Sequence, residues 1–483
     1  MVFQHFARRA IIGGSACSVL GGIFAYVGPQ CTASPSSPTT APSCGITTRI
    51  EAKLLIPGRG APIENGVVVI KGKKIYFAGP KSKAPKLQPE ESSVVFKVPC
   101  VMPGMWDCHV HFVGLPNDPQ GDMMDCFVKV PLEERAARCT VHAQKALNAG
   151  FTSVRDVGGM GGYIKTLVEG REIQGPNIYS AFDILSITGG HGDLNQFPSA
   201  CLDHCHGHGG SLCDGRTECL KGVREQLRKG ADLIKVCASG GVMSLGDDPT
   251  HQQFSDEELS IIVNEAGRAG RIVAAHCHGT AGIHAALNAG CHTIEHGSYL
   301  DEDSIAKMVR QHAVLVPTRW IIEELVGNIA ESDVKPPGLS DEAFEKVVYI
   351  YQRHLKSIKM AYAAGVPIAC GTDMFISKAW GRNGEELKYY VDDIGMTELE
   401  AIETATANGP MTLAKDGGYM SVKSGILRAG YDADIIALNR SPLDGNIEIL
   451  GKPENVILVV KGGEVEKCDE RGGVTKGNGC LDY

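Results

Sequence analysis

Two kinds of hydrophobic pattern alternate along the chain. Short apolar runs between turn residues, such as 66–70, predict β-strands in the region 46–98. Runs of the same kind return near the C-terminus, at 434–438 and 456–460. We therefore expect the segments 46–98 and 416–468 to build one small β-sandwich, with the middle of the chain inserted between them.

The middle of the chain, residues 99–415, repeats a different unit. A predicted helix ends in a glycine, a short apolar strand follows, and a polar residue ends the strand. The glycines are Gly150, Gly230, Gly270, Gly290 and Gly365. The eight expected strands lie near Val101, Ser153, Ile178, Ile234, Val273, Ile294, Val314 and Ile368. This α/β repeat predicts a (β/α)8 TIM barrel, whose chemistry lies at the C-terminal ends of its strands. An open doubly wound sheet is the alternative, but no Gly-rich dinucleotide-binding turn follows the first strand.

Histidines end the first of these apolar stretches, which runs from 99 to 112. His109 and His111 are two residues apart, so in a strand they share one face. Two neutral imidazoles on one face form half of a metal site. Two strand histidines without a metal are the simpler interpretation, so the rest of the chain has to decide.

Further strand-end residues complete the set, and Lys235 is the most informative of them. It lies inside the apolar run 233–236, where an ammonium is costly unless it is paired or uncharged. It is either a core lysine paired with a carboxylate or an amine that reacts with carbon dioxide to form a carbamate. Asp373 is either a turn aspartate or a metal ligand and proton acceptor. With His276 and His296, these residues predict two divalent cations that share an activated water.

The strand-end motifs resemble those of the metal-dependent amidohydrolase superfamily. They are Trp-Asp-Cys-His-Val-His at 106–111, Leu-Ile-Lys-Val at 233–236, Ala-His-Cys-His at 275–278, Ile-Glu-His at 294–296 and Gly-Thr-Asp at 371–373. The resemblance covers about residues 46–468 and is strongest to the imidazolonepropionase-like branch, which includes ochratoxinase and prolidase-like dipeptidases. It implies that His109 and His111 bind one cation and that His276 and His296 bind the other. It also implies that carboxylated Lys235 bridges two zinc ions, while Asp373 binds metal and acts as the general base.

Three residues beside the predicted metals are candidates for substrate contacts. His278 follows His276 by two residues, so it shares a strand face and is expected to hydrogen-bond the scissile carbonyl; a solvated loop histidine is the alternative. His191, between glycines after the third strand, is expected to line the pocket. Arg319 either grips a substrate carboxylate through two parallel hydrogen bonds or pairs with a structural carboxylate.

The N-terminus resembles a targeting segment. Two arginines precede an apolar run at 10–27, and residues 1–33 are expected to be a signal peptide of a secreted protein. An uncleaved membrane anchor at 10–27 is the alternative. A Ser/Thr/Pro-rich linker follows at 34–45, and the chain closes in a tail at 469–483.

A Cys/His-rich stretch after the third strand departs from the family pattern. Its cysteines are Cys201, Cys205, Cys213 and Cys219, among 17 in the whole chain. In a secreted protein such cysteines favour disulfides that staple a lid, and a third metal site is the alternative.

Together these features predict an enzyme that hydrolyses a small-molecule amide. The expected substrate is a dipeptide or an N-acyl or aryl-acyl amino acid. A cyclic amide or lactone hydrolase and a secreted metal- or ligand-binding protein without activity are the alternatives. The net charge of −9 gives no basic surface for nucleic acid. We expect a homo-oligomer.

Overall fold

The computed structural model describes residues 47–86, 93–117, 122–198, 210–326, 335–414, 421–470 and 475–476. The predicted leader and linker lie outside these residues, as do Cys201 and Cys205. Within the ranges given, no helix combines the length and apolar character that a membrane span requires.

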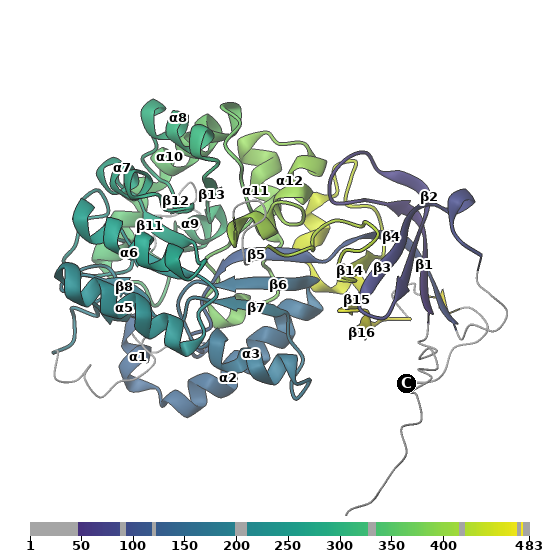
Figure 1. The fold of residues 1–483 in the computed structure, drawn as a ribbon, viewed down its shortest axis with the longest axis horizontal. Helices are drawn as coiled ribbons and strands as arrows, with labels where there is room; N and C mark the ends of the chain where they lie inside the picture. The colour runs from purple at the N-terminus through teal and green to yellow at the C-terminus, as the bar shows by residue number, and fades with distance from the viewer. Residues whose placement is uncertain are drawn as a thin grey trace, which may run out of the picture. The chain divides into compact units, whose positions relative to one another are not determined.

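Strands from both ends of the chain pair in one sheet, shown in purple and yellow in Figure 1. The strand β4 is central: it pairs in parallel with β1 and antiparallel with β14. Apolar side chains such as Ile50, Val68 and Ile457 are fully buried against this sheet. The sheet has the order β16 (Glu464–Cys468), β15 (Val456–Lys461), β14 (Ile435–Leu438), β4 (Ser93–Pro103), β1 (Thr47–Leu55), β2 (Ile63–Lys71) and β3 (Lys74–Pro80), with β17 (Thr475–Lys476) beside β4.

The middle of the chain forms short parallel strands in two sheets. The three-stranded sheet consists of β5 (Met105–Val110), β6 (Phe151–Asp156) and β7 (Asn177–Ser180). The six-stranded sheet has the order β13 (Val314–Val316), β12 (Thr293–His296), β11 (Val273–Cys277), β10 (Ile234–Cys237), β8 (Ile184–Ser186) and β9 (Gly210–Leu212). All neighbouring strands in both sheets run parallel, so their C-terminal ends lie on one side.

Contacts at two places link the two parallel sheets. The segment 366–374 lies between β13 and β5, because Ile368 bridges to Leu315 and Met374 bridges to Val110, both in parallel. On the other side, the amide of Asp232 donates to the carbonyl of Ser180 at 2.9 Å, which joins β7 to the residues before β10. The order of these contacts follows the order of strands that the sequence predicts.

The predicted strand 99–112 is two strands rather than one. Its first part is β4, in which Val101 pairs with Leu55 and Ala437 of the end sheet. The strand is interrupted at Gly104. This position leaves no room for a side chain, because a Cβ there would lie 2.1 Å from Thr152 Oγ1. The strand expected near Val101 therefore belongs to the end sheet, and the parallel strands begin with β5.

Helices separate most of the parallel strands along the chain, although only residues 181–183 lie between β7 and β8. All five glycines predicted to follow helices have positive φ, from 67° at Gly270 to 100° at Gly230, a conformation that favours glycine.

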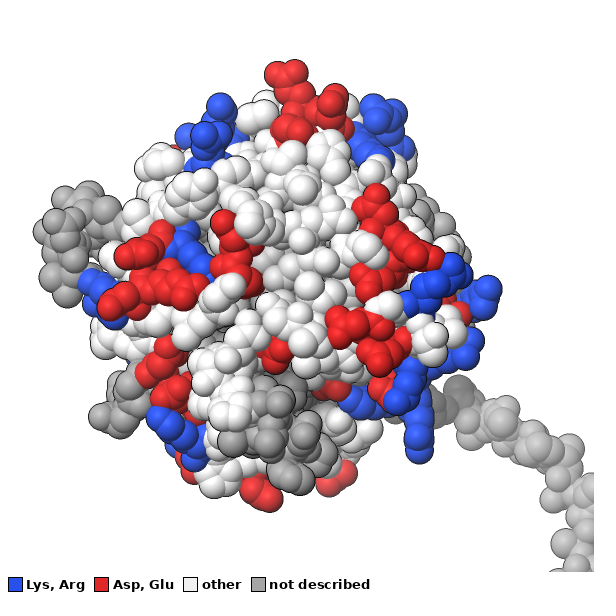
Figure 2. All heavy atoms as spheres, turned by 90° about the vertical axis from the view of Figure 1, so that its left-hand side faces the viewer, with Lys and Arg blue, Asp and Glu red and all other residues white. Residues whose placement is uncertain are grey.

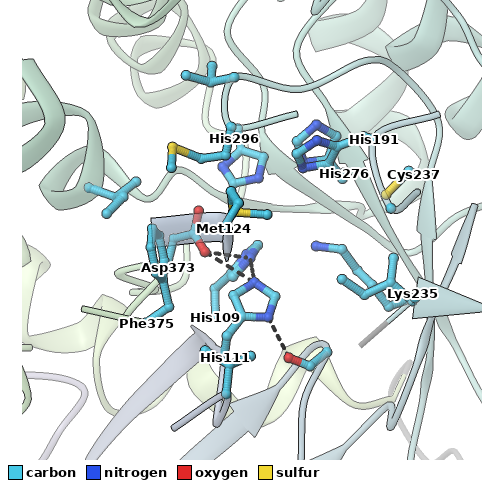
Figure 3. Close-up of a pocket in the computed structure, with 18 of the residues that line it drawn as sticks. His109, His111, Met124, His191, Lys235, Cys237, His276, His296, Asp373 and Phe375 are labelled. Atoms are coloured by element: carbon cyan, nitrogen blue, oxygen red, sulfur yellow. Dashed lines mark hydrogen bonds and ion pairs between the residues drawn. The ribbon is translucent and has the colours of Figure 1, made fainter. Parts of the chain in front are cut away.

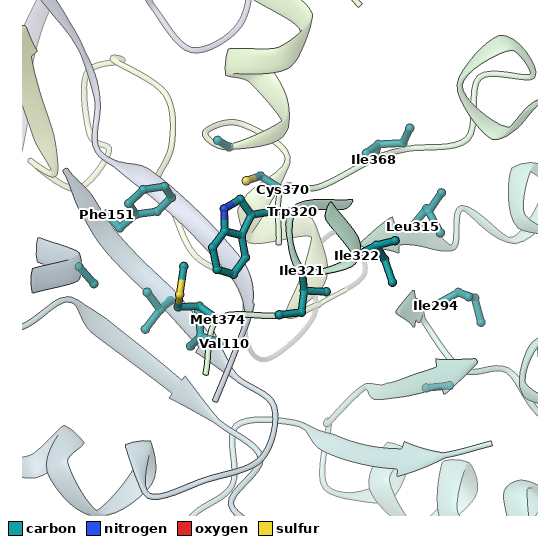
Figure 4. Packing of buried hydrophobic residues seen from close by; sticks show 14 of the residues in the cluster. Val110, Phe151, Ile294, Leu315, Trp320, Ile321, Ile322, Ile368, Cys370 and Met374 are labelled. Carbon is teal, nitrogen blue, oxygen red and sulfur yellow. The ribbon is translucent and has the colours of Figure 1, made fainter. Parts of the chain in front are cut away.

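Apolar side chains from α9, β5, β13 and the segment 366–374 form a buried cluster around Trp320 (Figure 4). The helices are α1 (Cys126–Lys129), α2 (Leu132–Asn148), α3 (Gly161–Glu169), α5 (Gly215–Lys229), α6 (Asp256–Arg268), α7 (Thr280–Ala289), α8 (Glu302–Gln311), α9 (Arg319–Val326), α10 (Asp341–Ala363), α11 (Glu385–Tyr389) and α12 (Glu398–Thr404).

Charge is mixed on the face that carries α5 to α8 in Figure 1. Figure 2 shows acidic and basic side chains in separate small groups around a mostly uncharged centre. The visible face thus has no single sign of charge that would attract a polyanion.

Candidate metal centre

The six predicted ligands all line one pocket (Figure 3). They lie at or just beyond the C-terminal ends of the parallel strands, where backbone pairing stops and side chains are free to converge. His109 is in β5 and His111 follows it, Lys235 is in β10, His276 is in β11, His296 ends β12 and Asp373 is in the segment 366–374. Residues up to 264 positions apart in the sequence therefore share one cavity, since His109 and Asp373 both border it.

The first group of donors consists of His109, His111 and Asp373. Asp373 Oδ1 lies 3.1 Å from His111 Nε2 and 3.5 Å from His109 Nε2. The two Nε2 atoms are 3.3 Å apart. The backbone fixes this meeting point, because the amide of Asp373 donates to the carbonyl of His109 at 2.7 Å. Three donor atoms thus face the same small space.

The other ring nitrogens of His109 and His111 are held by the protein. His109 Nδ1 donates to Glu295 Oε2 at 2.8 Å, and His111 Nδ1 donates to the carbonyl of Gly158 at 2.7 Å. Because these contacts require a proton on Nδ1, both Nε2 lone pairs remain available toward the pocket.

The second group consists of His276, His278 and His296, which offer one ring nitrogen each within 4.8 Å of one another. His276 Nε2 donates to the carbonyl of Gly240 at 3.1 Å, which leaves Nδ1 free. The Nδ1 atoms of His278 and His296 share hydrogen bonds with the hydroxyls of Ser298, at 2.7 Å, and Thr318, at 2.6 Å. Their Nε2 atoms are therefore the free ones.

Burial keeps the second group of imidazoles neutral. Loss of solvation, followed by the neighbouring imidazoles, lowers the pKa values of His276 and His296 well below the ordinary 6.5. A neutral imidazole is the form that binds a cation.

The surroundings of Asp373 favour its charged form, in contrast to the neutral imidazoles. Burial alone would raise the pKa of Asp373, but His109 and His111 outweigh it and lower the pKa below its ordinary value. The two groups together thus offer one carboxylate and five imidazoles, donor types that bind divalent cations such as zinc.

Lys235 is only 2% exposed, and its side chain borders the pocket. Burial lowers the pKa of Lys235 below 10.5, although Glu295 and Asp373 oppose the shift. Among the described carboxylates, none lies within ion-pair distance of its amine. The structure thus gives no support to the alternative of a core ion pair.

The three predicted substrate contacts have different positions. His278 and His191 line the pocket, and the ring of His191 stacks on that of His276 with 4.2 Å between centroids. Arg319 does not line it. Its guanidinium is fully buried, pairs with Glu323 and donates to the carbonyl of Tyr351 at 3.2 Å. Its position corresponds to the structural ion pair, the second of the two alternatives.

The cysteines of the predicted lid are described only in part. Cys213 and Cys219 are buried thiols, and Cys219 Sγ lies 3.8 Å from the carbonyl oxygen of Cys213. No disulfide forms between described residues. The prediction for Cys201 and Cys205 lies outside the described residues.

Two charged residues that the sequence did not predict lie beneath the predicted metal ligands. Glu295 and Arg155 are both fully buried, and Arg155 pairs with both carboxylate oxygens at 2.6 and 2.7 Å. Burial would raise the pKa of Glu295, but Arg155 and His109 lower it below its ordinary value. Little in the sequence marks them, because each lies in a strand that holds other polar residues: Thr152, Ser153 and Asp156 in the strand of Arg155, and Thr293 and His296 in the strand of Glu295.

Comparisons with known proteins agree with this arrangement. Residues 100–465 match the Amidohydrolase family. Ochratoxinase of Aspergillus niger is 41% identical over 431 residues, which cover 87% of this chain and 86% of that protein. The crystal structure of A. niger ochratoxinase is similar to this chain, with a TM-score of 0.80 and 39% identity. The aligned part covers 88% of this chain and 96% of the crystallised chain.

Prolidase structures are also similar. A prolidase in complex with N-methylphosphonate-L-proline has a TM-score of 0.76 at 30% identity, covering 88% of this chain and all of its own. A Xaa-Pro dipeptidase with methionine in its active site has a TM-score of 0.74 at 28% identity, covering 87% of this chain and all of its own. The chain belongs to the amidohydrolase family and is a hydrolase that acts on amide C–N bonds.

Proposed function

We propose that the chain is a binuclear metal-dependent amidohydrolase that cleaves the amide bond of a dipeptide or of an N-acyl or aryl-acyl amino acid. The observation that carries the proposal is the convergence of free ring nitrogens and one carboxylate on a single pocket. We also propose that the parallel strands close into a (β/α)8 barrel beside a β-sandwich. The bridges from the segment 366–374 to β5 and β13 support closure.

In this proposal His109 and His111 would hold one cation, and His276 and His296 would hold the other. Asp373 would be a further ligand, and a carboxylated Lys235 would offer an oxygen ligand to each cation. The carbamate would form when the uncharged Lys235 nitrogen bonds to the carbon of carbon dioxide and releases one N–H proton to solvent water. A buried amine with a lowered pKa supports this step, because only the uncharged amine is a nucleophile. When bound, zinc ions would supply Lewis-acid activation of water and of the substrate carbonyl.

The protein groups then move protons and hold the substrate. Asp373 accepts the proton that the attacking water loses and passes it to the leaving nitrogen. His278 is positioned for a hydrogen bond to the scissile carbonyl, since its Nδ1 is fixed by Ser298 while Nε2 is free. His191 lies against His276 and is proposed to contact the substrate from that side.

The rest of the pocket wall favours an apolar substituent on the substrate. Away from the metal ligands, the described lining is mainly aliphatic and aromatic, and α9 contributes three of its members. These apolar residues include Val113, Phe127, Ile321, Ile322, Leu325 and Phe375. Burying an apolar group against them contributes about 25 cal/mol for each Å² removed from water. We therefore expect a bulky apolar acyl or amino-acid side chain to be preferred over a small polar one.

A hydrolysis screen tests the proposal. The purified protein is stripped of metal with a chelator, reloaded with zinc, and given N-acyl amino acids and dipeptides that are matched in pairs. In each pair one member carries an aromatic or branched group and the other carries glycine in its place. The proposal expects amide cleavage only after reloading, with a higher kcat/KM for the apolar member. If no member of the panel is cleaved in a metal-dependent way, the proposal is contradicted.

A further inference from the structure

A fully buried ion pair connects the two parallel sheets beneath the pocket. Arg155 is in β6 of the three-stranded sheet, and Glu295 is in β12 of the six-stranded sheet. One terminal nitrogen of Arg155 donates to both oxygens of Glu295, at 2.6 and 2.7 Å. Neither side chain has any exposed surface.

The pair is part of a larger network of hydrogen bonds. Arg155 Nε donates to the carbonyl of Cys108 at 2.5 Å, and the second terminal nitrogen donates to Thr293 Oγ1 and to the carbonyl of Thr412, both at 3.1 Å. Thr293 Oγ1 in turn donates to Glu295 Oε1 at 2.5 Å. Satisfied buried networks of this kind hold their members in one arrangement.

This network contacts both groups of metal ligands. Glu295 Oε2 accepts from His109 Nδ1 at 2.8 Å, so it orients a ligand of the first group. Glu295 also precedes His296 directly, and His296 belongs to the second group. Cys108, whose carbonyl binds Arg155, directly precedes His109. One carboxylate and one guanidinium thus connect two groups of ligands that belong to different sheets.

We propose that Arg155 and Glu295 are a positioning pair that sets the spacing between the two groups of metal ligands. The inference rests on the proposed function, because the spacing matters only where two cations share a bridge. Stability alone does not require the pair, since replacing a buried ion pair by apolar residues of similar volume is often neutral or stabilising.

Two variants test the pair. In Glu295→Gln the side chain keeps its shape, but its NH₂ group opposes either His109 Nδ1–H or Arg155. We expect the affinity for one cation to fall about 10- to 100-fold, as when other partners of metal-binding histidines are removed. The double variant Arg155→Met/Glu295→Leu removes both charges, so we expect it to fold with an unfolding midpoint close to that of the wild type. It should nevertheless lose the same cation.

The measurement is the number of zinc ions per chain after gel filtration, with affinities from chelator competition and stability from urea unfolding. Glu265→Gln is the matched control. Glu265 also pairs with an arginine across two elements, with Arg224 Nε 2.7 Å away, but it lies outside the centre. The control should retain two zinc ions.

Each outcome decides one of the two proposals. A wild-type protein that binds no zinc, or only one ion, would contradict the binuclear function itself. A wild type and both variants that bind two ions with equal affinity would overturn the positioning pair alone. A double variant that fails to fold would also overturn it, because the pair would then serve folding rather than spacing.

Discussion

The two candidate metal-binding groups in the pocket differ in the charge of their members and of the groups next to them. The first, His109, His111 and Asp373, contains a carboxylate, and a second carboxylate accepts from His109. The second, His276, His278 and His296, is fully buried and is held by one backbone carbonyl and two hydroxyls. One group therefore brings its own negative charge and the other does not.

This difference indicates why Lys235 matters to the proposed mechanism. A divalent cation held only by neutral imidazoles in a buried site has its charge uncompensated, which is costly. As an amine, Lys235 would make this worse; as a carbamate, it would supply the missing negative oxygen ligand. The second group is thus expected to depend on carboxylation, whereas the first depends on Asp373.

The largest expected effect comes from the carboxylate of the first group. Asp373→Asn removes both the anionic ligand and the proton acceptor, so kcat should fall by about 100- to 10,000-fold. The measurement is turnover of the best amide substrate together with zinc content. Asp392→Asn changes a half-exposed aspartate that pairs with Lys388 at 2.6 Å, and it should leave turnover unchanged. Full activity of Asp373→Asn would remove its role.

Lys235→Ala tests the second group. Without the bridging carbamate, we expect loss of the cation at His276 and His296 and a fall in kcat of about 100-fold or more, which is about 2.7 kcal/mol or more in activation free energy. A short carboxylic acid such as propionate, added with zinc, should restore part of the activity because it places a carboxylate in the vacated space. Loss of the cation at His109 and His111 instead would reverse the assignment.

A smaller effect is expected from the hydroxyl that holds His296. Thr318 Oγ1 lies 2.6 Å from His296 Nδ1, and Thr318→Val deletes the hydroxyl while keeping the β-branched shape. Zinc affinity of the second group should fall about 10-fold, the lower end of the usual effect of such partners. Chelator competition measures it, and Thr318→Ser should bind zinc as the wild type does. Equal affinity in both variants would show that the neutral partners do not contribute.

The smallest effect concerns Glu386, a buried carboxylate that has no ion-pair partner among the described residues. Glu386 accepts from the backbone amides of Arg319, at 2.8 Å, and Trp320, and burial raises its pKa to about 8 from an ordinary 4.5. The folded state therefore binds more protons than the unfolded state between these two values, so wild-type stability falls as pH rises from 4.5 to 8. Glu386→Gln should lack this slope.

Urea unfolding at several pH values measures that difference. The contrast with Glu295, whose pKa is lowered by Arg155, isolates what a buried cation contributes to a buried carboxylate. Parallel pH profiles of the wild type and Glu386→Gln would contradict the assigned direction.

The sequence predicted the parts of the molecule that depend on local pattern. Polar residues that end apolar strands identified the six side chains that the structure brings into one pocket, although their metal-binding roles stay predictions. The break at Gly104 was missed, because Pro103 and Gly104 lie in a run that is apolar on both sides. The Arg155–Glu295 pair was missed because its members are 140 residues apart.

For Arg319, the sequence contained a feature that favours the structural ion pair over a substrate contact. Its partner Glu323 is four residues further along α9, the spacing at which helical side chains of opposite charge meet. The spacing of Arg319 and Glu323 in the sequence therefore predicts their ion pair. The leader, the linker and the Cys/His-rich stretch depend on residues outside the described ranges and stay predictions.

The most direct test of the central claim is a crystal structure of the zinc-loaded protein with anomalous diffraction at the zinc edge. We predict two anomalous peaks, one beside His109 and His111 and one beside His276 and His296, with density for a carboxylated Lys235 between them. A single peak, or an unmodified Lys235 amine that contacts neither zinc, would contradict the account.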